Sequence, residues 1–246
     1  MSYGHGPSYV GLRARYETHL IGVDLGRQND FAAPVIFEDE LVQKPVTRAP
    51  DEIPVRYRDV PSLLTRIYKG VDMSEWRGVS YPMTAQRIKR IVDSPMISRD
   101  YVLVVDSTGV GEAVIDMLRE SYHLNPVGVS FTSGNAVTMS PFGYNVPKRD
   151  LVVNLQVLFQ MERVKIAEEL ELAVTFREQL RHFTSTVNRR TGHEGFGADS
   201  EIEFDDLPMA AAIVLWYAEK ILAHQIEMPH RLGPAKEFDP ARHGLE

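Results

Sequence analysis

Cysteine is absent from this 246-residue chain, so disulfide bonds, cysteine-liganded zinc, iron–sulfur clusters and a thiol nucleophile are excluded. Long apolar segments are absent as well. The longest apolar run, Met209 to Ala218, is far short of the roughly 20 residues that span a bilayer. The N-terminus lacks the apolar region that a secretory signal requires. We therefore expect a cytoplasmic protein with no membrane partner, whose metal ligands, if any, are oxygen atoms or histidines.

An excess of positive charge is also missing. The chain has 27 Lys and Arg against 34 Asp and Glu, a net charge of −7. This balance argues against a protein whose whole surface grips nucleic acid, although it does not exclude a local basic groove. The 43% hydrophobic and 25% charged fractions are typical of a globular domain.

The pattern of apolar residues predicts an α/β chain. Expected strands cover residues 20–26, 31–38, 55–60, 101–106 and 127–131, the first two as a hairpin. Expected helices cover residues 84–92, 111–122, 147–164, 168–183 and 207–222, with a polar loop or hairpin at 185–203. Strand, helix and strand between 101 and 131 indicate a right-handed parallel crossover. We therefore expect a mixed five-stranded sheet flanked by helices on both faces.

The same pattern predicts one domain with two appendages. The expected elements all fall within residues 18–225, which we take as the domain. Residues 1–17 form an N-terminal extension in this interpretation. Residues 226–246 are rich in proline, histidine and charge, and we expect a flexible tail there.

Four aspartates are the candidate functional residues. Asp24 interrupts an apolar strand, Asp106 ends another, and Asp205 and Asp206 open the last helix. If the two strands are parallel neighbours and the helix begins at the same edge of the sheet, these carboxylates converge. Converging carboxylates require a cation, and their oxygen atoms suit Mg²⁺ or Mn²⁺. Two such ions about 4 Å apart catalyse phosphodiester hydrolysis in many nucleases.

Each aspartate also has a structural interpretation. Asp205 or Asp206 alone is more often a helix cap than a metal ligand. Asp106 and the residues after it fit an ordinary strand-to-helix turn about equally well. Asp24 favours function, because an unpaired carboxylate in a buried strand costs several kcal/mol.

The order of three motifs resembles the nuclease domain of the large terminase subunit of tailed bacteriophages. The motifs are GVDLG around Asp24, VVDSTGVG around Asp106, and FDDLPMAAAIVLWYA around Asp205 and Asp206. The resemblance covers residues 18–225 approximately. It implies an RNase H-like fold and a metal-dependent endonuclease that cuts concatemeric viral DNA. It also implies that the four aspartates bind the metal ions, with Asp24 as the bridging ligand.

The resemblance implies partners too: double-stranded DNA, a terminase ATPase domain or subunit, the small terminase and the portal. Two features depart from the family pattern. Phe204 stands where family members often have a histidine, and no Walker A motif is present. We expect Lys148, Arg189 and Arg190 to contact DNA phosphates, because a helix start and a polar loop can border the acidic edge. His182 and His193 lack ligand spacing and are expected on the surface.

Two other functions remain open. The glycine-containing turns after Asp24 and Asp106 also resemble the phosphate loops of the actin-like ATPase superfamily, so the chain can be read as an ATP-dependent small-molecule kinase. A non-catalytic module that binds the packaging motor is the other alternative. Four aspartates in the expected order favour the nuclease.

Overall fold

The computed structural model describes residues 18–26, 31–43, 64–187, 194–198 and 205–223. The strand expected at 55–60, the extension 1–17 and the tail 226–246 lie outside these residues. No helix in the described part is long and apolar enough to cross a membrane.

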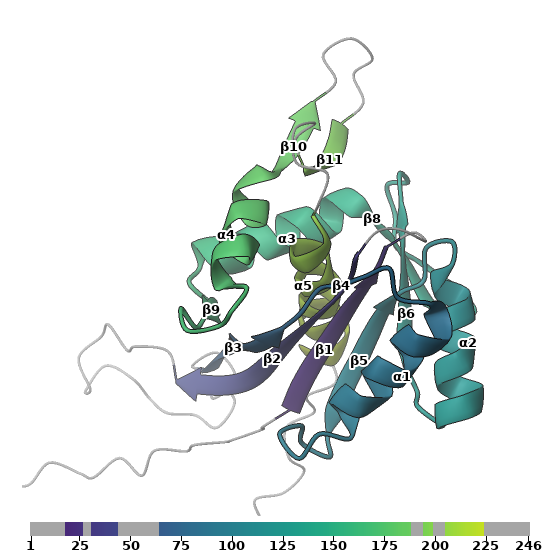
Figure 1. Ribbon diagram of the computed structural model, residues 1–246. Helices are drawn as coiled ribbons and strands as arrows, with labels where there is room; N and C mark the ends of the chain where they lie inside the picture. Colours follow the sequence, from purple (N-terminus) through teal and green to yellow (C-terminus); the bar gives the residue numbers. More distant parts are fainter. Residues whose placement is uncertain (1–17, 27–30, 44–63, 188–193, 199–204, 224–246) are drawn as a thin grey trace, which may run out of the picture.

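The structure is built on one mixed sheet that contains nine strands among the described residues. Along the sheet the order is β7, β8, β6, β5, β1, β2, β3 and β9, and β4 pairs with β2 (Figure 1). β1 pairs antiparallel with β2 and parallel with β5. The strands are β1 (Thr18–Leu25), β2 (Phe31–Gln43), β3 (Leu64–Met73), β4 (Trp76–Arg77), β5 (Tyr101–Asp106), β6 (Val127–Thr132), β7 (Thr138–Met139), β8 (Gly143–Pro147) and β9 (Val164–Ile166).

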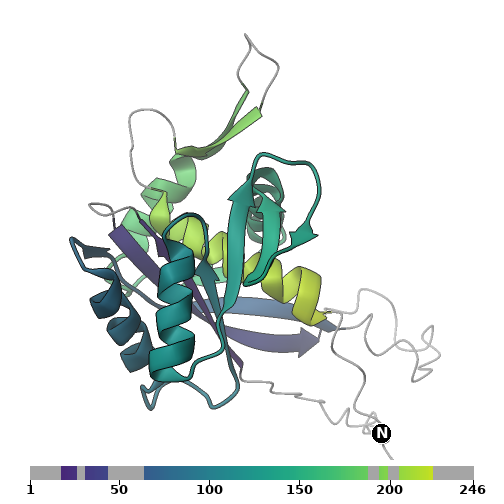
Figure 2. The same ribbon diagram turned by 90° about the vertical axis from the view of Figure 1, so that its right-hand side faces the viewer.

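Helices cover both faces of the sheet, as the sequence predicts. One face packs against α1 (Tyr81–Val92) and α2 (Gly111–Tyr122), and the other against α3 (Lys148–Gln160), α4 (Ala173–His182) and α5 (Asp206–Tyr217) (Figures 1 and 2). α5 is buried along its whole length, and a π-helical turn continues it at Ala218–Leu222. A separate hairpin, β10 (Phe183–Val187) and β11 (Glu194–Ala198), follows α4 and extends away from the sheet.

The sheet has more strands than the five predicted, and the difference begins at β3. Charged side chains interrupt its apolar pattern, but they form ion pairs with the neighbouring strand β2. Arg66 pairs with Asp39, and Lys69 lies 2.6 Å from Glu40. The strand packs Tyr68 and Met73 into the core, while the charged residues pair with β2 and obscure its apolar pattern.

Helix α3 ends at Gln160, earlier than the predicted residue 164. Glu162 adopts a left-handed conformation with φ of 55°, and the Arg163 amide donates to the Leu158 carbonyl at 2.9 Å. This is the hydrogen-bond pattern of a Schellman cap. After this turn, Val164–Ile166 forms β9 beside β3. α4 likewise begins at Ala173 instead of the predicted residue 168, after a short turn.

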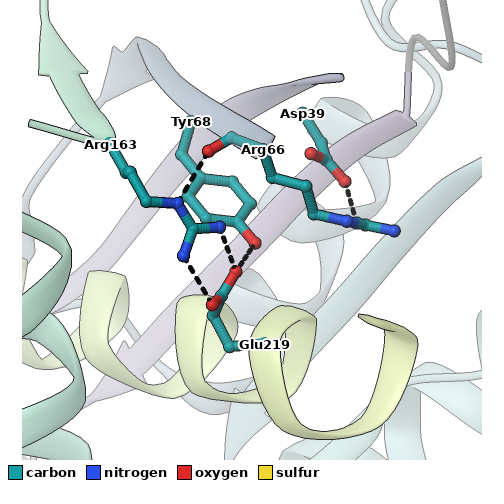
Figure 3. Close-up of polar contacts among 5 residues, drawn as sticks. All are labelled: Asp39, Arg66, Tyr68, Arg163 and Glu219. Carbon is teal, nitrogen blue, oxygen red and sulfur yellow. Dashed lines mark hydrogen bonds and ion pairs between the residues drawn. The ribbon is translucent and has the colours of Figure 1, made fainter. Parts of the chain in front are cut away.

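A buried polar cluster fixes the carboxyl end of the α5 segment (Figure 3). Glu219 accepts hydrogen bonds from both terminal nitrogens of Arg163, at 2.8 and 2.6 Å, and from the Tyr68 hydroxyl. Arg163 also donates from Nε to the Arg66 carbonyl at 2.9 Å, and Arg66 pairs with Asp39. The cluster therefore joins the π-helical turn to β2 and β3.

Candidate functional site

Asp24 and Asp106 lie side by side at the carboxyl ends of two central strands. β1 and β5 run parallel, and their register pairs Val23 with Val105, the residues directly before the two aspartates. The predicted parallel neighbourhood of these strands is thus confirmed. The carboxyl edge of parallel strands is where ligands usually bind in α/β sheets.

The amino end of α5 reaches the same edge because β1 and α5 touch without a side chain between them. A Cβ atom at Gly22 would lie 2.1 Å from the Ala210 carbonyl oxygen, so only glycine permits this approach. Asp24 lies on the same strand face as Gly22, and Asp206 lies one helical turn before Ala210. The contact therefore directs Asp206 toward Asp24.

The pKa values of the two strand aspartates reflect this crowding. Asp24, Asp106 and Asp206 are buried, with 7%, 4% and 8% of their surface exposed. Burial raises the pKa of Asp24 well above its ordinary value, and the charges of Asp106, Asp206 and Asp205 raise it further. Burial also raises the pKa of Asp106 to about 6, although hydrogen bonds with Thr108 and Asp24 oppose the increase. The charges of Asp106, Asp206 and Asp205 thus all act on Asp24, and we call these four residues the acidic centre.

Asp205 occupies the N-cap position of α5, but its carboxylate makes no capping hydrogen bond. Instead, its Oδ2 atom pairs with Nζ of Lys148 at 3.2 Å. Lys148 is the first residue of α3, and its charge lowers the pKa of both Asp24 and Asp106. The sequence-predicted Lys148 is thus at the acidic centre, where it forms an ion pair with Asp205.

Thr108 holds the Asp106 side chain in place. The Thr108 amide donates to Oδ1 of Asp106 at 2.7 Å, and the Thr108 hydroxyl accepts the Phe131 amide at 3.0 Å. Ser107 and Ser130 share a further hydrogen bond of 2.8 Å between their hydroxyl groups. The turn after β5 is thereby tied to β6, so the carboxylate has a fixed orientation.

A glutamine that the sequence analysis did not single out caps α5. The side chain of Gln179, from α4, accepts the Leu207 amide at 3.2 Å and donates to Glu75 at 2.9 Å. Gln179 is only 5% exposed. The available sequence signal was its position three residues after the apolar Phe176, which places a polar side chain on the buried face of the helix.

The donor chemistry of the centre suits a hard divalent cation. All four acidic side chains offer oxygen atoms, the ligands that Mg²⁺ and Mn²⁺ prefer, and a dication would offset the repulsion that raises the pKa of Asp24. Among the described residues, however, no group of three or more His, Asp or Glu side chains is arranged to hold a metal ion. The carboxylates therefore fit a divalent metal ion by donor type, and holding one would require their arrangement to change.

The other predicted residues are not part of the described site. Arg189, Arg190 and His193 lie outside the described residues, and so does the side chain of His182. Of the expected DNA contacts, the structure thus describes Lys148 alone.

Sheet order, helices and acidic edge together define an α/β fold of the RNase H-like class, as predicted. No family model and no curated protein matches the chain. Among solved structures, the fold is similar to that of the large terminase nuclease from thermophilic phage G20c. That likeness has a TM-score of 0.53 and 16% identity, and it covers 82% of each chain. The same nuclease with bound magnesium gives 0.52, 18% and 82% of each chain, and with bound cobalt 0.50, 18% and 80% of each chain.

Proposed function

We propose that this chain is a metal-dependent endodeoxyribonuclease that cuts concatemeric viral DNA during genome packaging. The observation that carries the proposal is the position of Asp106, Asp205 and Asp206 around Asp24 at one edge of the sheet, where their charges act on Asp24. The similarity in fold to a terminase nuclease with bound magnesium supports it.

In this proposal the four aspartates would hold two Mg²⁺ or Mn²⁺ ions, with Asp24 as a ligand shared by both sites. Bound ions of this kind activate a water molecule and stabilise the leaving oxygen of a phosphodiester. The Thr108 amide fixes Asp106 for this task. Lys148 forms an ion pair with Asp205, and we propose that it contacts a substrate phosphate when DNA is bound.

The proposed substrate is double-stranded DNA, and Arg189 and Arg190 are proposed as further phosphate contacts. The proposed partners are a terminase ATPase domain or subunit, the small terminase and the portal. We assign the nuclease to residues 18–225, with 1–17 and 226–246 as appendages.

Plasmid cleavage tests the activity. We expect the purified protein to nick or linearise plasmid DNA with Mg²⁺ or Mn²⁺ and to be inactive in chelator. Asp24→Asn should abolish cutting, whereas Asp116→Asn, on the exposed side of α2, should not. Full cutting by Asp24→Asn across a metal titration would show that the acidic centre is not the active site.

A thermal-shift measurement separates the nuclease from the kinase alternative. ATP with Mg²⁺ should stabilise the protein no more than Mg²⁺ alone, because a DNA nuclease needs no binding site for ATP. A distinctly larger shift with ATP would favour the kinase. Metal binding without any cleavage would favour the non-catalytic module.

A further inference from the structure

Gln179 and Glu75 form a partly buried link between the start of α5, where Asp205 and Asp206 lie, and the strands beside Asp24. Glu75 lies between β3 and β4, directly after Ser74, whose amide donates to the Pro34 carbonyl of β2 at 3.1 Å. Pro34 follows Ala33, the residue that pairs with Asp24 across the sheet. Glu75 is therefore fixed to the strand that flanks Asp24.

The other end of the link is the first turn of α5. The Gln179 side chain accepts the Leu207 amide at 3.2 Å, directly after Asp205 and Asp206 in the chain. This is the hydrogen bond that an N-cap side chain normally makes. Because Gln179 makes it, the carboxylate of Asp205 remains turned to Lys148 instead of to its own helix.

The two hydrogen bonds also fix how the amide of Gln179 is turned. Its oxygen faces the Leu207 amide and its nitrogen faces Glu75, at 2.9 Å. Glu75 has only acceptor oxygens when ionised, so it holds the amide nitrogen on its own side. The orientation that caps α5 is thus enforced by Glu75, from the connection between β3 and β4.

We propose that Gln179, held by Glu75, is a positioning residue that sets the distance between the Asp205–Asp206 pair and Asp24 and thereby the affinity of the centre for divalent metal. The inference rests on the proposed metal-dependent function. A helix cap that served stability alone would change the melting temperature without changing metal affinity in the folded protein. Replacing a residue that orients a metal ligand, without itself binding the metal, commonly changes the affinity for the metal about 10-fold or more.

The test is direct binding of Mn²⁺, measured by calorimetry on the full chain without DNA, with circular dichroism in chelator as the check of folding. Gln179→Met, which removes both hydrogen bonds at similar size, should weaken Mn²⁺ binding about 10-fold. Gln156→Met, on the exposed side of α3, is the matched control and should bind Mn²⁺ like the wild type. A folded Gln179→Met with wild-type affinity would overturn the inference.

An exchange of the two side chains tests the link even if Gln179→Met does not fold. Gln179→Glu places two carboxylates face to face and should weaken Mn²⁺ binding. Glu75→Gln should be nearly neutral, because its amide oxygen still accepts from Gln179. The double variant Glu75→Gln/Gln179→Glu restores both hydrogen bonds, since the new glutamine donates and the new glutamate accepts twice.

Recovery of Mn²⁺ affinity in the double variant would establish the link, and failure to recover would overturn it. Wild-type affinity in Gln179→Glu would overturn it as well. If the wild-type protein itself does not bind Mn²⁺, the proposed metal-dependent function fails together with this inference. If the wild type binds and the variants bind equally well, only the inference about Gln179 fails.

Discussion

Replacing Asp106 with asparagine should stabilise the metal-free protein and weaken its binding of metal. The variant loses a buried negative charge but keeps an oxygen to accept the Thr108 amide, which lies 2.7 Å from Oδ1. Burial raises the pKa of Asp106 from 3.8 to about 6. A difference of about 2 pKa units corresponds to about 3 kcal/mol, which the ionised carboxylate costs the folded protein at about pH 8.

We therefore expect metal-free Asp106→Asn to be more stable than the wild type at about pH 8, by about 1 to 3 kcal/mol, because the asparagine amide must also be buried. At roughly 2 to 4 °C per kcal/mol for a domain of this size, the melting temperature should rise by several degrees. The measurement is thermal unfolding in chelator, with the exposed Asp116→Asn as control. With excess Mn²⁺ the order should reverse, because the wild type gains the free energy of metal binding.

The pH dependence has a definite sign. Since the folded-state pKa of Asp106 lies above its unfolded value, the wild type gains stability relative to the variant as pH falls through about 6. The part of the difference that comes from ionisation should be lost by about pH 3.8, the unfolded-state value, so that only the cost of burying the asparagine amide remains. A variant that is less stable than the wild type in chelator at about pH 8, or a difference that does not change with pH, would refute this reasoning.

Three further predictions concern packing, charge and substrate. Gly22→Ala should lower the free energy of unfolding by about 1 to 3 kcal/mol or more, because α5 must move away from β1; Gly134→Ala, where the nearest atom is 3.6 Å from the added Cβ, is the control in thermal melts. Glu219→Gln should cost about 1.5 to 3 kcal/mol through weakened bonds to Arg163 and Tyr68. Although burial opposes it, those bonds lower the pKa of Glu219, so the stability lost in this variant, measured against the exposed Glu171→Gln, should shrink as pH falls. Binding to linear duplex DNA should weaken by roughly one to three orders of magnitude from about 50 to 200 mM salt and further in Arg189→Ala/Arg190→Ala, and salt-resistant binding to one sequence would contradict it.

Much of the fold follows from local sequence patterns. β1 and β5 are continuous apolar runs, and α2 has helical spacing with a glycine at its start, so their positions agree closely with prediction. β3 escaped prediction because charged residues such as Lys69 break up its apolar pattern, and their partners, such as Glu40, lie on a different segment of the chain. The end of α3 escaped it because a glutamate, Glu162, takes the left-handed position that glycine usually fills.

The candidate site, too, could be predicted from the sequence only in part. Asp24 could be predicted because a carboxylate within an apolar strand is costly without a role. The ordinary cap interpretation of Asp205 could not be decided from sequence, because it depends on whether another side chain caps the helix. Gln179 performs that task from α4, and its partners Leu207 and Glu75 are far from it in the chain. The spacing of apolar residues along the chain gives no sign of contacts of this kind.

The close approach of β1 and α5 also constrains how the protein folds. The strand that carries Asp24 is synthesised long before the helix that covers its glycine face, so one side of the central sheet lacks its cover until nearly the whole described chain has emerged from the ribosome. Contacts between segments so far apart in sequence form slowly, because a long loop must close first. An incomplete chain holds Asp24 and Asp106 without the Asp205–Asp206 pair. No nascent fragment that ends before α5 therefore contains the complete acidic centre.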